Sequence, residues 1–170
     1  MLTLATDADL PEAVKLINAS YRGETSRQGW ANEADYIDGE RTTLEALRAD
    51  LKANPAAKLY LMRNSADGGL LGCVWLEPHD REVWYLGLLT VRPDLQDRQL
   101  GRTMLAEAEA VVRREGGRTV RMTVVHLRDT LIAWYQRRGY ILTGETSPFA
   151  PVDPPRDDLH FIVLQKPLSA

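Results

Sequence analysis

The stretch Trp84-Tyr-Leu-Gly-Leu-Leu-Thr-Val-Arg-Pro93, continued by Asp94-Leu-Gln-Asp-Arg-Gln-Leu-Gly101, decides the fold. Its first half is apolar and stops at a proline, which predicts a buried strand that ends there. A helix follows the polar turn, because apolar side chains recur at helical spacing: Leu100, Met104, Ala108 and Val111. A strand that turns directly into a helix directs free backbone N–H groups, and the positive end of the helix dipole, at one point. That point predicts an anion site, and phosphate is its usual occupant.

The turn matches neither of two common phosphate loops, G-x-x-x-x-G-K-[ST] and G-x-G-x-x-G. What remains is Gln96-x-x-Gln99-x-Gly101, preceded by Val91-x-Pro93. This pattern resembles the acyl-CoA-binding motif Q/R-x-x-G-x-G/A of the GCN5-related N-acetyltransferases, the GNAT superfamily. Gln99 stands where the family motif has its first glycine, and its backbone N–H is still available to a phosphate.

A second stretch, Leu131-Ile-Ala-Trp-Tyr-Gln-Arg-Arg-Gly-Tyr140, follows about thirty residues later. It resembles another GNAT signature, A-x-x-x-Y-x-x-x-G-F/Y, with Tyr135 and Gly139 in place. Leu131 stands at the family alanine, and Arg128 stands where the family often has asparagine. The two motifs occur in the expected order and spacing, and the predicted order of helices and strands matches the GNAT fold along nearly the whole chain.

Periodicity along the chain predicts the element order β-α-α-β-β-β-α-β-α-β-β. The hairpins make the early strands antiparallel, and the central helix joins parallel neighbours by a right-handed crossover. We therefore expect an α/β (α+β) fold with a mixed, partly splayed central sheet and helices on both faces, as in the GNAT fold. Residues 140–143 are predicted as a short strand, and residues 147–158 as a proline-rich loop. A length of 170 residues fits a single domain, residues 1–170.

Composition excludes several classes of function. A formal net charge of −3, and aromatic residues that do not alternate with lysine or arginine, argue against nucleic-acid binding. The single cysteine, Cys73, fits a reducing compartment, and neither a signal peptide nor a membrane-spanning apolar run is visible, so we expect a cytoplasmic protein without a membrane partner. Because His79, His126 and His160 lack ligand-like spacing, no metal is expected.

The resemblance implies acetyl-CoA as co-substrate, bound where strands 82–91 and 119–125 splay apart. Pantetheine would pair with the strand backbone there, and the diphosphate would rest on the N–H groups of residues 96–102. Arg98 and Arg102 either add charge to the phosphates or are solvated residues at a helix start. The implied cofactor-binding residues are Leu89, Thr90, Val91, Gln96, Asp97, Arg98, Gln99, Leu100, Gly101, Arg102 and Leu131.

The implied reaction is attack of an amine on a thioester, and Tyr135 matches the family tyrosine that protonates the leaving thiolate. A phenol with a pKa near ~10 keeps its proton at neutral pH and can donate it to a thiolate. The other interpretation of Tyr135 is an aromatic packing residue like its neighbour Trp134. No carboxylate occupies the strand positions of a family base, so a water chain or an amine that arrives neutral would also serve. Four residues are candidate bases by proximity in sequence alone: Glu77, His79, Glu82 and His126.

Acceptor choice is expected from loops near the thioester. Residues 21–41 are rich in aromatic and carboxylate side chains, which suit a cationic amine, although a packed lid with solvated charges fits equally. Residues 147–158 are expected to form the opposite wall. Three hypotheses follow: an N-acetyltransferase acting on a primary amine of a small molecule or peptide, a non-catalytic acyl-CoA-binding regulatory module, and an interaction domain that binds no CoA. A homodimer through the last strand is left open.

Overall fold

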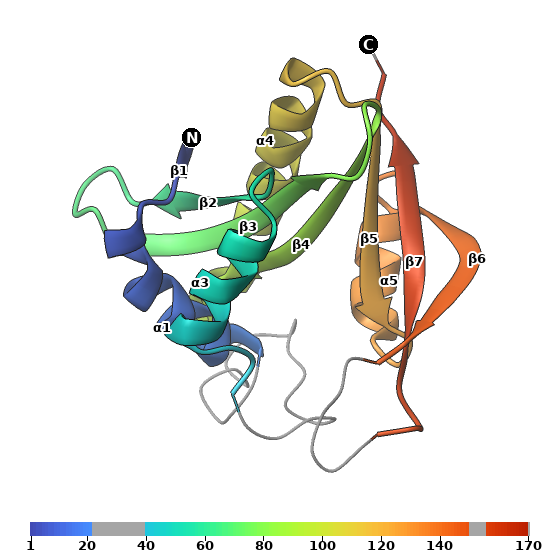
Figure 1. Ribbon diagram of the computed structural model, residues 1–170, viewed down its shortest axis with the longest axis horizontal. Coiled ribbons are helices and arrows are strands. Elements are labelled where there is room, and N and C mark those ends of the chain that lie inside the picture. Colours follow the sequence, from blue (N-terminus) through green and yellow to red (C-terminus); the bar gives the residue numbers. More distant parts are fainter. Residues whose placement is uncertain (22–39, 150–155, 170) are drawn as a thin grey trace.

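The computed structural model describes residues 1–21, 40–149 and 156–169 of the chain (Figure 1). These residues form a seven-stranded sheet of order β1-β2-β3-β4-β5-β7-β6 and four α-helices. The strands are β1 Leu2–Leu4, β2 Lys58–Arg63, β3 Leu70–Pro78, β4 Val83–Val91, β5 Thr119–Val125, β6 Ile141–Pro148 and β7 His160–Pro167. The helices are α1 Leu10–Tyr21, α3 Leu44–Ala53, α4 Leu100–Arg114 and α5 Asp129–Gln136. Both the element order and the mixed sheet confirm the sequence prediction.

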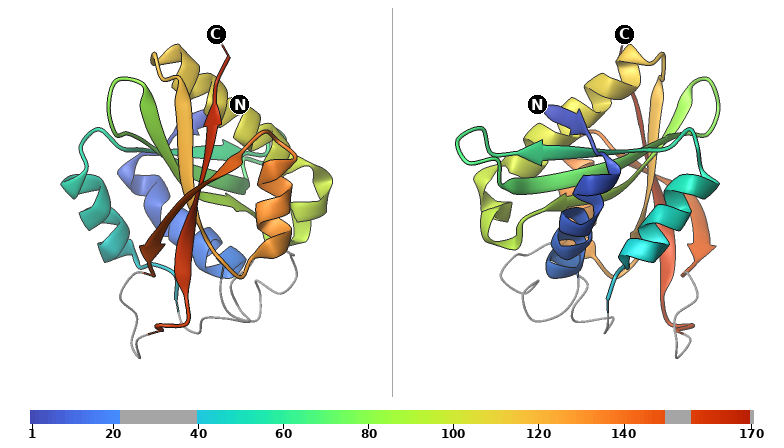
Figure 2. Two further views of the ribbon diagram at one scale, coloured as in Figure 1. Left: turned by 90° about the vertical axis from the view of Figure 1, so that its right-hand side faces the viewer. Right: turned by 60° about the vertical axis from the view of Figure 1, so that its left-hand side comes forward.

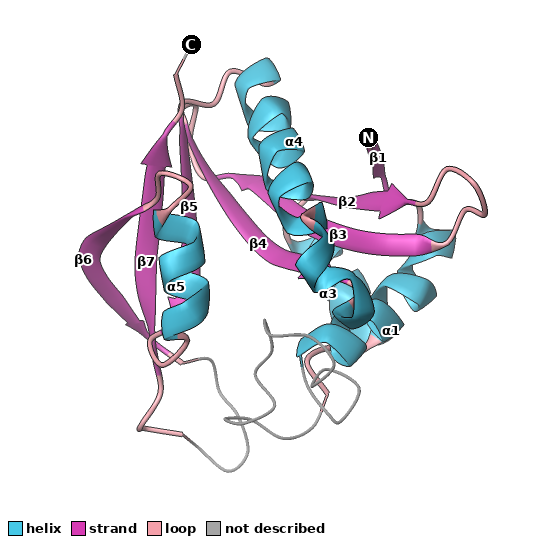
Figure 3. Cartoon of the chain, turned by 180° about the vertical axis from the view of Figure 1, so that it is seen from behind, coloured by secondary structure: helices cyan, strands magenta, loops and turns pink. Residues whose placement is uncertain are grey.

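Helices cover both faces of the sheet, α1 and α3 on one side and α4 and α5 on the other (Figures 1 and 3). Alternation along β3 explains this arrangement, because successive side chains of a strand point to opposite faces. Cys73 and Trp75 belong to the apolar cluster that contains α1 and α3, whereas Val74 and Leu76 belong to the cluster that contains α4. The sheet is therefore buried on both sides where the helices cover it.

The parallel pair β4 and β5 opens along its length. Residues 83–85 pair with residues 119–121, and no further pairing joins these two strands. Beyond that point they diverge, which confirms the predicted splay (Figure 1). Figure 2 shows that the C-terminal end of α1 and the N-terminal end of α5 lie at the same end of the molecule, on opposite sides of the sheet. The opening is thus bordered by the ends of two helices.

The C-terminal hairpin differs from the prediction in two respects. β6 continues to Pro148, beyond the predicted end at residue 143, and pairs with β7 up to Pro148 opposite His160. A proline is tolerated there because β6 is an edge strand. The last strand, β7, pairs with β5 on one side and β6 on the other, so it has no free edge for the dimer considered above. None of the helices in the three described ranges has the length and apolar character that crossing a membrane requires.

Candidate active site

β4 contains a bulge beside the opening. Cys73 pairs with Thr90 and Trp75 with Gly87, so one residue of β3 faces two residues of β4. Leu88, in the bulge, has a φ of 48°, which is rare for a residue with a branched side chain. The hydroxyl of buried Thr90 donates a hydrogen bond to the Leu88 carbonyl at 2.8 Å. Thr90 therefore holds the bulge in place.

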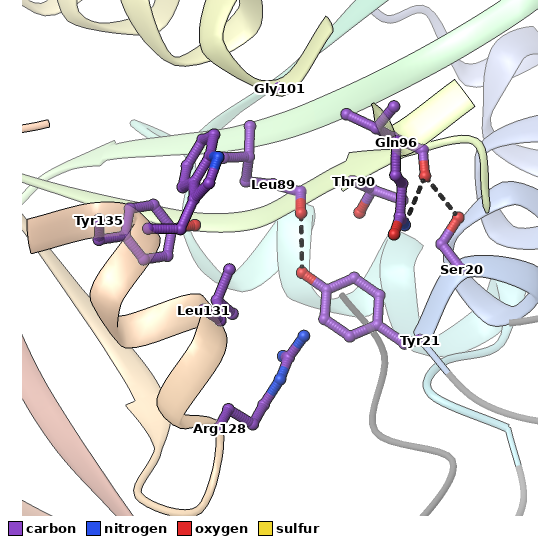
Figure 4. Close-up of a pocket in the computed structure, with 11 residues that line it drawn as sticks. Ser20, Tyr21, Leu89, Thr90, Gln96, Gly101, Arg128, Leu131 and Tyr135 are labelled. Carbon is purple, nitrogen blue, oxygen red and sulfur yellow. Dashed lines mark hydrogen bonds between the residues drawn. The ribbon is translucent and has the colours of Figure 1, made fainter. Parts of the chain in front are cut away.

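Beyond the bulge, two β4 carbonyls accept hydrogen bonds from side chains instead of from β5 (Figure 4). The Tyr21 hydroxyl donates to the Leu89 carbonyl at 3.0 Å. The Ser20 hydroxyl and the Gln96 amide both donate to the Val91 carbonyl at 3.2 Å. Side chains can release such bonds at little cost, so these carbonyls remain available to the amide groups of an extended ligand. The predicted pairing of pantetheine with Leu89 and Val91 is compatible with this geometry.

The turn between β4 and α4 is a short 3-10 helix, Pro93–Arg98, followed by Gln99 at a φ of 62°. Gln99 is the N-cap residue of α4, and its exposed side chain makes no capping hydrogen bond. The first N–H groups of α4, from Leu100 onward, thus have no acceptor within the helix. Gln99 adopts the left-handed conformation that glycine prefers, and its side chain leaves the first N–H groups of α4 uncapped.

A narrow pocket of about 60 Å³ lies between β4, the first turn of α4 and α5. It brings together six of the predicted cofactor-binding residues: Leu89, Thr90, Val91, Gln96, Gly101 and Leu131. A Cβ atom at Gly101 would lie 3.4 Å from the Trp134 ring, at the limit of ordinary van der Waals contact. A side chain larger than alanine at this position would therefore narrow the pocket.

The pocket continues into a groove of about 540 Å³ lined by Gln96, Gln99, Gly101 and Arg102 on one side and by α5 and the residues after it on the other. Arg138 lies over the Trp134 ring at 4.0 Å, and its buried Nε has no hydrogen-bond partner among the described residues. Burial, and then the nearby Arg102 and Arg137, lower the pKa of Arg138. Three cations that repel one another suit a multivalent anion.

Two of these arginines were not identified as site residues from the sequence. The predicted stretch 96–102 is only partly described by the structure. Arg137 and Arg138 line the groove with Arg102, and the signal for them was a pair of cations directly before Gly139 in the second motif. Asp97 and Arg98 lie in the 3-10 helix before α4, and their side chains fall outside the described part of the structure.

Tyr135 lines both the narrow pocket and the larger pocket on its far side. Figure 4 shows its hydroxyl directed from α5 toward β4. Burial raises the pKa of Tyr135 well above its usual value, Tyr21 and Tyr85 add to the rise, and Arg128 opposes it. Among the described residues, none forms a hydrogen bond with this hydroxyl. Its ring also packs edge-on against the Trp134 ring, at a centroid distance of 5.1 Å, as the packing interpretation of Tyr135 predicts.

The larger pocket, of about 290 Å³, fills the opening between β4 and β5. Near its closed end, the Tyr85 and Thr123 hydroxyls lie 3.3 Å apart and bridge the two strands. The charged residues among its described lining are Arg41 and Arg128, both cations. Most of residues 21–41 and of residues 147–158, from which acceptor walls were predicted, lies outside the described residues.

The four candidate bases are engaged elsewhere and do not line this pocket. Glu77 accepts a hydrogen bond from the Trp75 indole at 3.1 Å, and Glu82 pairs with Arg118 at 3.6 Å. Stacking occupies the two imidazoles: His79 on Tyr85, with ring centroids 5.5 Å apart, and His126 on His160, at 3.9 Å. Within the part of the chain that the structure describes, no three His, Cys, Asp or Glu side chains group as metal ligands.

The site thus combines a helix start that has no side-chain cap with a pocket between two diverging strands. The sequence matches the model of the acetyltransferase (GNAT) family over residues 24–140, and the chain therefore belongs to that family. The predicted class, an acetyl-CoA-dependent N-acetyltransferase, is confirmed by this membership.

Solved structures share the fold at low sequence identity. A ribosomal-protein-alanine N-acetyltransferase from Brucella melitensis is 20% identical, with a TM-score of 0.72 over 99% of both chains. Ard1 from Thermoplasma volcanium is 14% identical, with a TM-score of 0.72 over 100% of this chain and 98% of that one. A phosphinothricin acetyltransferase from Sinorhizobium meliloti, solved with acetyl-CoA, is 14% identical, with a TM-score of 0.70 over 99% and 88%. No curated protein matches the sequence.

Proposed function

We propose that residues 1–170 act as one acyl-CoA-binding domain that moves an acetyl group from acetyl-CoA to a primary amine of a small molecule or peptide. The amine attacks directly, and Tyr135 is the general acid. The observation that carries this proposal is the position of the Tyr135 hydroxyl, at the junction of the narrow pocket and the larger one. A group placed there reaches the point at which a thioester in one pocket meets an amine in the other.

The cofactor half of the proposal assigns a role to each predicted element. The N–H groups of residues 96–102 hold the diphosphate, and Arg102 and Arg138 add positive charge across the groove. Leu89 and Val91 present backbone groups to pantetheine, while Leu131 forms the opposite wall. Acetyl-CoA supplies the acetyl thioester, and the protein supplies its position.

The chemistry requires one proton to move. As the amine nitrogen bonds to the acetyl carbon and the carbon–sulfur bond breaks, Tyr135 gives its proton to the sulfur and regains one from the nitrogen. The raised pKa keeps Tyr135 protonated before the reaction. Because N–H and C=O of one strand residue point to the same edge, Leu89 N–H is positioned to stabilise the developing oxyanion. The described lining contains no base, so the amine arrives neutral.

The test is Tyr135→Phe, assayed by thiol release from acetyl-CoA with a library of amines. We expect kcat to fall at least about tenfold, because a positioned acid contributes that much or more, while acetyl-CoA affinity changes little. Tyr60→Phe, on β2 and away from both pockets, is the matched control and should retain full activity. An unchanged kcat in Tyr135→Phe would remove the hydroxyl from the mechanism.

A further inference from the structure

We propose that Glu109 and Tyr140 are positioning residues, which hold Tyr135 where its hydroxyl reaches the junction of the two pockets. The inference rests on the proposed function, because it concerns the general acid of the same reaction. The family motif has phenylalanine or tyrosine at the position of Tyr140, so the resemblance assigns no role to this hydroxyl. In this chain the hydroxyl belongs to a buried polar cluster that is part of the described lining of neither pocket.

The cluster is centred on a buried carboxylate of α4. Glu109 is only 5% exposed, and the Tyr140 hydroxyl donates a hydrogen bond to its Oε1 at 2.9 Å. The Lys166 ammonium donates to both oxygens of the same carboxylate, at 2.9 and 3.1 Å. Burial, and then the Glu109 carboxylate, raise the pKa of Tyr140, so its hydroxyl stays protonated and acts as the donor. Two side chains therefore hold the carboxylate in place.

Stability alone does not explain this cluster. A buried ion pair is often no more stabilising than apolar side chains of the same volume, because the loss of hydration offsets the attraction. A polar network whose members are all hydrogen-bonded instead fixes one arrangement of the elements that it joins. Here those elements are α4, the segment between α5 and β6, and β7.

The cluster lies at the closed end of the opening between β4 and β5. Lys166 of β7 pairs with Val120 of β5, and Val120 pairs with Trp84 of β4, within the short stretch where β4 and β5 are still joined. α4 directly follows β4 and shares a face of the sheet with α5, which follows β5 (Figure 3). The bonds of Glu109 thus link the two sides of the opening, and they fix α5 relative to α4.

Tyr140 connects the cluster to Tyr135. Its ring packs edge-on against the Tyr135 ring, with centroids 5.6 Å apart, and its N–H donates to the Tyr135 carbonyl at 3.2 Å. The chain can reverse between the two tyrosines because Gly139 has a φ of 95°, and a Cβ atom there would lie 3.3 Å from Cε of Lys166. The end of α5 therefore rests on the cluster through both its backbone and its rings.

The position of the Tyr135 hydroxyl depends on this support. The hydroxyl has no hydrogen-bond partner among the described residues, so the packing of its ring determines where it points. Trp134 also packs on this ring, but it belongs to the same helix and moves with it. Tyr140 is held from outside the helix, by Glu109. Because proton transfer requires hydrogen-bond distance to the sulfur, a small displacement of the ring removes much of the effect of the acid.

The experiment is a double-mutant cycle of Tyr140→Phe and Tyr135→Phe, assayed by thiol release from acetyl-CoA. Tyr140→Phe keeps the ring and removes the bond to Glu109. We expect it to lower kcat about fivefold without changing acetyl-CoA affinity, because the acid moves and the cofactor site does not. In the Tyr135→Phe background the same change should alter kcat by less than about twofold, because no proton remains to be positioned. Tyr60→Phe, which also removes one phenol hydroxyl, is the control and should have no effect in either background.

The outcomes separate this inference from the proposed function. If Tyr140→Phe lowers kcat by the same factor in both backgrounds, the cluster only stabilises the fold and the inference is wrong. The inference is also wrong if Tyr140→Phe retains full kcat while Tyr135→Phe does not, and the acid role then stands. If Tyr135→Phe itself retains full kcat, the acid role fails and the inference fails with it.

Two variants of Glu109 distinguish its hydrogen bond from its charge. Glu109→Gln keeps an acceptor for Tyr140, so kcat should stay within about threefold, although Tm should fall because Lys166 loses its counter-charge. Glu109→Leu removes the acceptor and should lower kcat as Tyr140→Phe does. If Glu109→Leu does not fold, the cycle with Tyr140→Phe decides alone. A loss of kcat in Glu109→Gln as large as that in Tyr140→Phe would overturn the inference, because the charge and not the position of Tyr140 would then be responsible.

Discussion

The proposed cofactor half of the site is built from consecutive backbone groups, whereas the proposed acceptor half is built from side chains of distant segments. On the cofactor side, the bulge of β4, the 3-10 helix Pro93–Arg98 and the start of α4 present N–H and C=O groups in chain order. On the acceptor side, Arg41, Arg128 and Tyr21 meet from three separate parts of the chain. One half therefore depends on local geometry, and the other depends on how the whole fold closes.

The difference determines how each half responds to substitution. Backbone groups survive most changes of side chain, which explains how Gln99 can stand at a family glycine and still leave its N–H in place. The requirement is conformational: among described residues other than glycine, positive φ occurs at Leu88 and Gln99, at either end of this half. In the acceptor half, a single substitution can change the charge of the pocket. Cofactor binding should therefore be robust, and acceptor specificity should be easily altered.

Gly101→Val tests the cofactor half with the largest expected effect. The added atoms meet the Trp134 ring, which would lie 3.4 Å from a Cβ, and fill the 60 Å³ pocket. We expect acetyl-CoA affinity, measured by calorimetry, to fall on the order of 100-fold, about 2.7 kcal/mol. Ala106→Val, at an exposed position of the same helix, controls for a β-branched residue in α4 and should bind normally. Normal affinity in Gly101→Val would mean that pantetheine lies elsewhere.

The pH profile tests the acceptor half. With no base in the described lining, kcat/KM should rise about tenfold per pH unit until the pH reaches the pKa of the acceptor amine. Tyr135 must be protonated to act, and burial raises its pKa, so its proton is retained and no fall should occur below about pH 10. Two acceptors with different amine pKa values should shift the profile by their difference. An inflection that stays fixed for both acceptors would reveal a base on the enzyme.

The same contrast explains what the sequence could predict. The cofactor half could be predicted because Gln96, Gln99 and Gly101 are close in sequence and one turn sets their spacing. The mixed sheet could be predicted because the apolar periodicity that identifies each strand and helix is also a local property of the sequence. The splay itself was implied by the resemblance to the GNAT family, not by periodicity.

The side chains that line the acceptor half could not be predicted from the sequence, for a physical reason. Nothing local to Arg41 or Arg128 indicates that both reach Tyr21, because their meeting depends on how α1 and α5 are placed across the opening. The end of β6 was misplaced for a similar reason: Pro148 ends a central strand but is tolerated at an edge, and sequence alone does not reveal which strand is the edge. The expectation of a cationic acceptor, which came from residues 21–41, stays a prediction, because most of these residues lie outside the described part of the structure.

Gln99→Gly has the smallest expected effect and tests whether backbone conformation alone governs the cofactor half. Glycine adopts a φ of 62° without the steric cost that other residues incur, so the free energy of unfolding should rise by about 1 kcal/mol. For a chain of this length, that corresponds to an increase in Tm of roughly 2–4 °C. Gln99→Ala removes the side chain but keeps the strain, and should not raise Tm. Acetyl-CoA affinity should stay within about threefold in both variants, because the N–H at this position is retained. If the two variants shift Tm equally, the glutamine side chain, and not the left-handed backbone conformation, determines the stability of this turn.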